Sequence, residues 1–86
     1  MKIWVATYRI GDIDGIVCAT ENIDAAIAKI IDEQGSWADY FVECWENGRR
    51  IGRIDANHVW SPDGDSVNEA ETFKQIKSRC VKFQEV

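Results

Sequence analysis

The sequence predicts an α+β fold in one domain, 1–86: a mainly antiparallel sheet of four to five strands with two helices. Two segments, 2–20 and 38–54, each hold two β-rich runs around a turn. Each is followed by residues whose apolar positions recur at helical spacing. The order hairpin, helix, hairpin, helix is typical of two helices packed on one face of a single sheet.

The first hairpin begins with residues 2–10, which are rich in β-branched and aromatic side chains and end at Gly11. Residues 11–15, G-D-I-D-G, have the composition of a turn and predict a loop of four or five residues. Residues 16–20 then predict the return strand.

A helix is predicted over residues 23–34. Asn22 is a suitable N-cap, and Asp24 in the first turn favours the positive end of the helix dipole. Gly35 follows as a C-terminal stop. One face carries an apolar stripe of Ile23, Ala26, Ile27, Ile30 and Ile31.

The second hairpin is predicted from strands 38–46 and 49–54, because Asn47-Gly48 is the strongest short hairpin signal. Residues 55–66 indicate a loop with a turn at Pro62-Asp63-Gly64 and a short strand at 57–60. A second helix begins at Ser66, which forms a capping box with Glu69. Residues 81–86 alternate in polarity and predict a last strand or an extended tail.

Neither of the predicted strands 2–10 and 38–46 has a clean polar face, and two short helices cannot easily cover both sides of the sheet. We therefore expect an aromatic patch of Trp4, Tyr8 and Trp45 that something must cover, because monomers rarely expose large apolar patches. One interpretation covers it with the 55–66 loop and the C-terminal segment, through Val59, Trp60 and Phe83. The other makes the patch an interface, since Trp and Tyr dominate binding hot spots.

We expect no catalytic residues, no cofactor and no metal site. After Asp12-x-Asp14 and Asp63-x-Asp65 the remaining calcium-loop ligands are missing, and His58, the single histidine, lacks a partner for catalysis. The three cysteines are Cys18, Cys44 and Cys80. Their odd number and wide spacing exclude a disulfide framework and a zinc motif and favour a reducing, cytoplasmic environment.

The charge is acidic, −5 overall, with −6 in residues 1–46 and +1 in residues 47–86. This balance argues against direct nucleic-acid binding, which needs a basic surface, and favours a protein partner with a basic surface. No apolar run approaches the ~18 residues of a membrane helix, so no membrane contact is expected. The acids expected to meet the partner are Asp12, Asp14, Asp32, Glu33 and Asp39.

The one basic cluster is Arg49, Arg50 and Arg53, in which Arg49 and Arg53 are expected to share a strand face. Such arginines either protect an exposed sheet edge from aggregation or contact a phosphate or an acidic partner. The first interpretation is the more economical.

Three segments carry a family resemblance: K-I-W-V-A-T-Y…D-G-I-V in 2–17, N-I-D-A-A-I-A-K-I-I at 22–31 and Y-F-V-E-C-W-E-N-G at 40–48. They resemble small acidic α/β proteins of phages and prophages, among which are anti-CRISPR inhibitors. The resemblance covers about the first 54 residues, judged from the order of elements, and carries no functional residues across. It implies a non-enzymatic inhibitor that occupies the basic groove of a nuclease or surveillance complex, although −5 is a mild charge for a nucleic-acid mimic.

We therefore expect a non-catalytic intracellular protein-binding module, a phage-type inhibitor of a host nucleic-acid-handling complex. One alternative is a structural module that forms a homodimer through the aromatic sheet face. Another is a small antitoxin-like, nucleic-acid-binding regulator, since the opening hairpin and helix are also similar to the partial RNase-like fold of some antitoxins. That regulator would use Arg49, Arg50 and Arg53.

Overall fold

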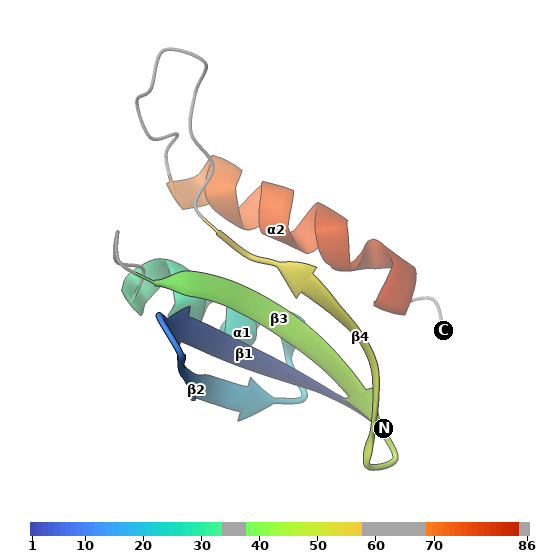
Figure 1. Cartoon of the computed structure of the whole chain (residues 1–86). Helices are drawn as coiled ribbons and strands as arrows, with labels where there is room; N and C mark the ends of the chain where they lie inside the picture. Colours follow the sequence, from blue (N-terminus) through green and yellow to red (C-terminus); the bar gives the residue numbers. More distant parts are fainter. Residues whose placement is uncertain (34–37, 58–68, 85–86) are drawn as a thin grey trace.

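The protein is described by a computed structural model that covers residues 1–33, 38–57 and 69–84, and in these residues one antiparallel sheet packs against two helices (Figure 1). The predicted α+β class is confirmed. The four strands are arranged in the order β2-β1-β3-β4. Along the chain the elements are β1 (Lys2–Ile10), β2 (Ile13–Thr20), α1 (Ile23–Glu33), β3 (Asp39–Glu46), β4 (Arg49–Asp55) and α2 (Glu69–Gln84).

The two hairpin turns are both tight. Asn47 and Gly48 have φ angles of 54° and 79°, the double positive φ that a two-residue type I′ turn requires. In the first hairpin Ile10 pairs directly with Ile13, so the loop is two residues long and the predicted four- or five-residue loop is wrong. Gly11 has a φ of 60°, which lets the chain reverse at once and releases the following residues to pair.

Helix α1 begins where the sequence predicts. The Asn22 side chain accepts hydrogen bonds from the backbone N–H groups of Asp24 and Ala25, at 2.9 and 3.3 Å. These bonds satisfy two of the donors that a helix start leaves free. At the other end the Tyr40 hydroxyl donates to the carbonyl of Glu33 at 2.9 Å, which joins the end of α1 to the start of β3.

Helix α2 continues through Gln84, so neither the last strand nor the extended tail predicted for residues 81–86 is formed over residues 81–84. Ile76, Cys80 and Phe83 are buried and follow one another at helical spacing. Helix formation buries all three on one side, whereas a strand would turn neighbouring residues to opposite sides. The predicted cap at Ser66, residues 58–60 of the predicted short strand and the turn at Pro62 lie outside the described residues.

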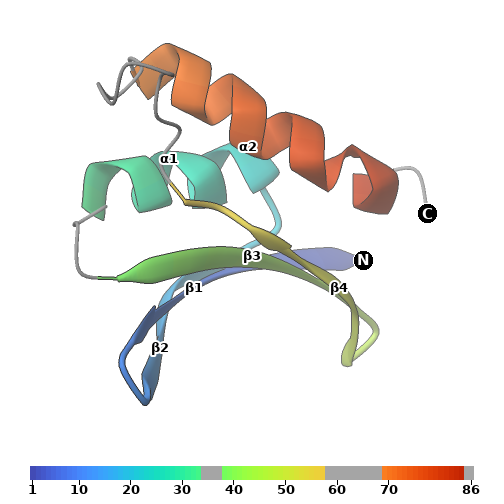
Figure 2. The ribbon, with the colours of Figure 1, turned by 45° about the horizontal axis from the view of Figure 1, so that its top comes forward.

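Both helices lie on the same side of the sheet (Figure 2). Helix α1 packs over β1, β2 and β3, whereas α2 packs against α1 and β4. The sheet curves, and its concave side faces away from the helices (Figure 2). The core between the layers contains Trp4, Ala6, Ala26, Ile27, Ile30, Tyr40, Val42, Cys44, Ile54, Ala56, Ile76, Cys80 and Phe83.

The aromatic ring of Phe83 packs directly against Gly52. A Cβ atom added to Gly52 in β4 would lie 2.1 Å from Cε1 of Phe83, so the ring of Phe83 rests directly on the strand backbone. Gly15 in β2 has the same relation to Tyr8, with a distance of 2.2 Å to the ring Cζ. Two aromatic side chains thus fill the space that two missing side chains leave in the sheet.

Candidate functional site

The candidate site is the side of the sheet opposite the helices, which we call the open face. The register pairs Val5 with Glu43 and Glu43 with Arg53, so these residues share one side of the sheet. Among the described residues no helix covers this side. The open face is formed by Ile3, Val5, Thr7, Arg9, Asp14, Ile16, Phe41, Glu43, Trp45, Arg50 and Arg53.

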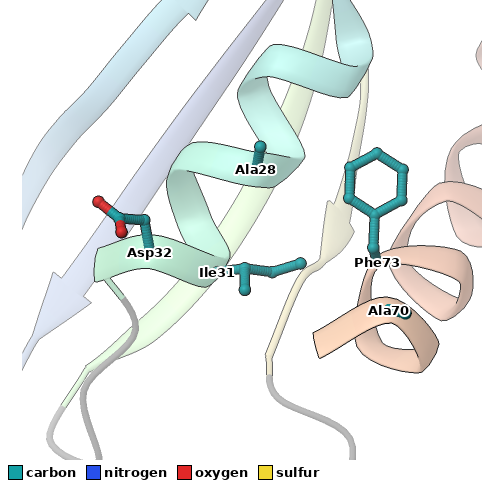
Figure 3. Close-up of a pocket in the computed structure, with 5 residues that line it drawn as sticks. All are labelled: Ala28, Ile31, Asp32, Ala70 and Phe73. Carbon is teal, nitrogen blue, oxygen red and sulfur yellow. The ribbon is translucent and has the colours of Figure 1, made fainter. Parts of the chain in front are cut away.

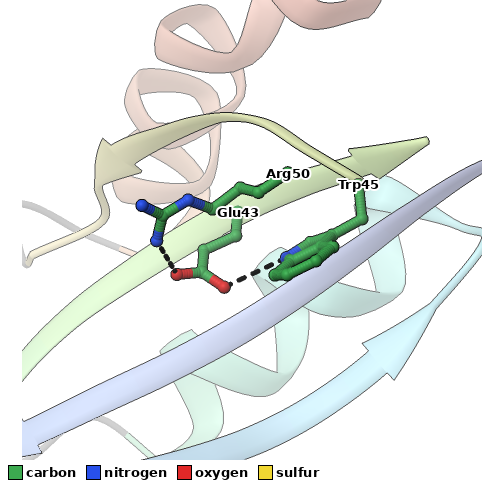
Figure 4. A network of polar contacts seen from close by, with 3 residues as sticks. All are labelled: Glu43, Trp45 and Arg50. Atoms are coloured by element: carbon green, nitrogen blue, oxygen red, sulfur yellow. Dashed lines mark hydrogen bonds and ion pairs between the residues drawn. The ribbon is translucent and has the colours of Figure 1, made fainter. Parts of the chain in front are cut away.

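Glu43 organises the centre of the open face (Figure 4). One carboxylate oxygen accepts from the indole Nε1 of Trp45 at 3.1 Å, and the other accepts from Arg50 at 3.0 Å. Only 13% of the Glu43 side chain is exposed. A nearly buried carboxylate needs such donors, and the bonds hold the indole in one orientation. The polar atom of Trp45 is therefore satisfied within the chain, and its ring carbon atoms remain available for apolar contact.

A β-bulge decides which arginines reach the open face. Cys44 pairs with Gly52, but the next residue, Trp45, pairs with Arg50, so Ile51 is the extra residue of β4. The bulge reverses the alternation, and Arg50 rather than Arg49 shares the open face with Arg53. The prediction that Arg49 and Arg53 share a strand face is therefore wrong, because the regular alternation on which it relied does not reveal a bulge.

A hollow of about 290 Å³ lies on the open face. Two ion pairs flank it: Arg9 with Asp14 at 3.2 Å and Arg50 with Glu43 at 3.0 Å. Arg53 stacks over the ring of Phe41, 3.8 Å from its centroid, and forms no ion pair within the described part of the chain. The hollow is lined by Thr7, Tyr8, Asp14, Gly15, Ile16, Glu43, Arg50 and Arg53.

The expected aromatic patch is not formed. Trp4 is only 4% exposed and belongs to the core beneath the helices, so it cannot contact a partner in the folded protein. Tyr8 lies on that same side and packs against the core. Trp45 alone of the three lies on the open face. Within one strand, residues two apart share a face of the sheet. Whether Trp4 of β1 and Trp45 of β3 share a face depends on how the two strands are paired, and the sequence does not specify this register.

The five predicted acids, in contrast, lie together at one end of the domain, which we call the acidic end. Asp12 is in the β1–β2 turn, and Asp14 is the second residue of β2; Asp32 and Glu33 end α1, and Asp39 begins β3. All five are exposed. Antiparallel topology places these element ends side by side (Figure 1).

The acids at this end are not all free to meet a partner. Asp14 pairs with Arg9, and Glu33 pairs with Lys29 at 3.1 Å. Because these pairs are exposed, each contributes little stability and can exchange partners. Asp39 lies opposite Arg9 in the register without a salt bridge in the described residues.

One acid of this end was missed by sequence reasoning. Asp55 is the exposed last residue of β4 and pairs with Phe41, two residues after Asp39. The predicted hairpin around Asn47-Gly48 contains the signal for Asp55. In an antiparallel hairpin the last residues of the second strand lie beside the first residues of the first strand, which here places Asp55 near Asp39. Trp45, six residues along β3 from Asp39, lies roughly 20 Å from the acidic end.

The thiols offer no nucleophile. Burial raises the pKa of the Cys80 thiol to about 11, and the neighbouring Cys44 thiol adds to this effect. Burial also raises the pKa of Cys44 and of Cys18. All three are free cysteines. Reactive cysteines need a depressed pKa and access to solvent, so these three are typical of structural thiols.

A second hollow, of about 470 Å³, lies between the two helices (Figure 3). Ile31 extends from α1 toward α2, the ring of Phe73 lies between the two helices, and Ala28 and Ala70 complete the apolar walls of the hollow. Asp32 lines its rim, with the carboxylate turned away from Phe73 (Figure 3). Among the described residues that line this hollow, no convergent polar groups could orient a ligand.

The described residues hold neither a metal-binding cluster nor a membrane-spanning helix. Within residues 1–33, 38–57 and 69–84, no group of three His, Cys, Asp or Glu side chains could hold a metal ion. None of the helices described has the length and apolar character needed to cross a membrane. His58 and the Asp63-x-Asp65 turn lie outside the described residues.

Comparison of the chain with protein-family models, with curated proteins and with solved structures finds no match.

Proposed function

We propose that this chain is a non-catalytic protein-binding module that docks its open face against a partner protein with a basic, partly apolar surface. The observation that carries the proposal is the indole of Trp45, which is held by Glu43 on a sheet face that the helices leave uncovered. Trp is the residue most enriched in binding hot spots, and a side chain already fixed in one orientation loses less entropy on binding.

The acidic end supports a basic partner. Five acids and Asp55 gather there, and the chain carries a net charge of −5. A concentration of one sign of charge steers an oppositely charged partner toward the surface and raises the association rate. The open face supplies the apolar contacts, and the acidic end supplies the orientation.

We further propose that the partner belongs to a nucleic-acid-handling complex and that binding inhibits it. This step rests on the resemblance to phage inhibitors and on charge: a basic groove that holds phosphates also attracts an acidic protein. It is tested by adding the purified chain to the captured complex and measuring binding of that complex to its nucleic acid.

The docking proposal is tested by affinity capture from a lysate, followed by binding measurements on the protein that is retained. Trp45→Ser is compared with the matched surface variant Val81→Ser, since Val81 is 44% exposed on α2 and lies off the open face. We expect Trp45→Ser to weaken binding by roughly 10- to 100-fold, the range of a hot-spot residue, and Val81→Ser to leave it unchanged. The thermal midpoint of Trp45→Ser should change by only a few degrees, because the side chain lies outside the core.

The charge component has its own test. The double variant Asp12→Asn/Asp39→Asn should slow association, while Glu21→Gln, an exposed acid at the other end of the domain, should not. Binding should weaken with added salt, because exposed charges are screened beyond about 8 Å at physiological ionic strength. Equal binding by wild type and Trp45→Ser would refute the open face as the docking surface, and salt-independent association would refute the role of the acidic end.

A further inference from the structure

We propose that the hollow of about 290 Å³ on the open face binds a carboxylate group, with Arg53 as the principal donor and Arg50 beside it. This inference goes beyond the proposed function, because it assigns a ligand chemistry to the hollow and can be tested on the chain alone. It rests on a guanidinium group that stacking holds in place and that has no acidic partner among the described residues.

Arg53 is held over the ring of Phe41. Its guanidinium carbon lies 3.8 Å from the ring centroid, close enough for a cation–π contact. Stacking uses the flat face of the guanidinium group, whereas its N–H groups point outward in the plane of that group. These N–H groups are the part of arginine that binds a carboxylate through two parallel hydrogen bonds. The stacked ring therefore orients the donors before a ligand arrives.

The acid opposite Arg53 is already occupied. Glu43 pairs with Arg53 in the register of β3 and β4. The two carboxylate oxygens of Glu43 instead accept from Trp45 and from Arg50 (Figure 4). In the part of the chain that the structure describes, no other acid forms an ion pair with Arg53. No described acid therefore competes with a ligand for this guanidinium group.

The charges around the hollow favour a ligand with a single negative charge. Arg50 is paired with Glu43 and Arg9 with Asp14, so these four charges cancel. The positive charge of Arg53 is left over. A carboxylate neutralises it, whereas a phosphate group with almost two negative charges would bring an excess charge close to Glu43 and Asp14. The charge balance therefore indicates a carboxylate.

The size of the hollow and its other walls fit a short acid. It lies on the concave side of the sheet (Figure 2), and its volume is at the lower limit of ligand pockets. Thr7 brings a hydroxyl group to its wall, and Ile16, which is 69% exposed, brings an apolar side chain. A carboxylate on two or three carbon atoms matches these walls, as in an aspartate or glutamate side chain or a small organic acid.

An NMR titration of the labelled chain with sodium propionate, exchanged against sodium chloride at constant ionic strength, tests the proposal. The amide signals of Thr7 and Ile16 and the side-chain signal of Arg53 should shift and saturate. The dissociation constant should be on the order of tens of millimolar, because ion pairs open to solvent are weak. Propionamide, which has the same shape without the charge, should give no saturable shift.

Two arginine variants locate the binding. Arg53→Gln should weaken propionate binding by roughly fivefold or more, and it should fold normally because Arg53 is exposed. Arg49→Gln is the matched control. It removes the same charge from the same strand, but Arg49 pairs with Glu46 on the other side of the sheet. Propionate binding to Arg49→Gln should equal that of wild type.

Three results would overturn the proposal: shifts that do not saturate, equal shifts with propionamide, or equal weakening in the Arg49 and Arg53 variants. Tighter binding of inorganic phosphate than of propionate would overturn the assignment to a carboxylate.

A second measurement identifies the source of the carboxylate. If Arg53→Gln binds the captured partner protein more weakly than wild type does, and propionate competes with that partner, the carboxylate belongs to an acidic side chain of the partner. If Arg53→Gln loses propionate but binds the partner normally, the ligand is a free small acid. The titration needs no partner, so a failure of Trp45→Ser to weaken docking would refute the proposed function and leave this inference standing.

Discussion

Replacing Gly52 with alanine tests how α2 is fixed to the sheet. An added Cβ would lie 2.1 and 2.2 Å from Cε1 and Cζ of Phe83, where real contacts need more than 3 Å, so the ring must withdraw. If the ring stays in place, overpacking of this kind lowers the free energy of unfolding by about 1–3 kcal/mol. If the ring moves into solvent instead, the loss falls in the same range, because Phe83 is only 8% exposed in the folded protein. Gly52 does not have a positive φ, so alanine adds no backbone strain and recovers about 0.4–1 kcal/mol from the unfolded state.

The net expectation is a loss of about 2 kcal/mol in the free energy of unfolding, which lowers the thermal midpoint by roughly 10 °C in a domain of this size. Chemical denaturation of four proteins measures the coupling: wild type, Gly52→Ala, Phe83→Leu and the double variant. Leucine lacks the two ring atoms that collide with the new Cβ, so Gly52→Ala should cost almost nothing in the Phe83→Leu background. If Gly52→Ala lowered the free energy of unfolding equally in both backgrounds, the proposed packing of the Phe83 ring on Gly52 would be refuted.

Two more predictions follow from the core. Thr72 is fully buried, and its hydroxyl has no hydrogen-bond partner in the described structure. Thr72→Val should therefore raise the free energy of unfolding by about 1 kcal/mol in urea denaturation, and a decrease would show that the hydroxyl is satisfied. Cys80 has a raised pKa of about 11 when folded, against an ordinary value of 9.0, so the unfolded chain loses this proton first and stability falls as the pH rises from 9 to 11. The stability advantage of wild type over Cys80→Ala should shrink by about 2–3 kcal/mol across that window, and a constant difference would contradict the burial of the thiol.

The local elements could be predicted because their signals are local. The side chain of Asn22, the Asn47-Gly48 pair and the spacing of Ile27 and Ile30 each act within a few residues of chain. The end of α2 was mispredicted because alternating polarity over six residues resembles both a strand and the end of an amphipathic helix. Only the packing of Phe83 on Gly52 distinguishes the two.

The candidate site was predicted in part. The acids that were expected to meet a partner lie at turns and element ends, and the sheet order gathers them at one end of the domain. Trp4 and Trp45 were assigned to one patch, but the register between β1 and β3 places them on opposite sides of the sheet. Register is a long-range property, set by how two distant strands bury their apolar residues together.

Composition, hairpin turns and helix caps determined that this chain forms hairpins and helices in a fixed order, because those preferences arise from neighbouring residues. Which side of the sheet the helices cover, the bulge that turns Arg50 toward Glu43, and the register that places Trp4 and Trp45 on opposite sides of the sheet were decided only in the folded molecule. Each of these depends on contacts between residues far apart in the chain, and such contacts exist only once the layers have packed.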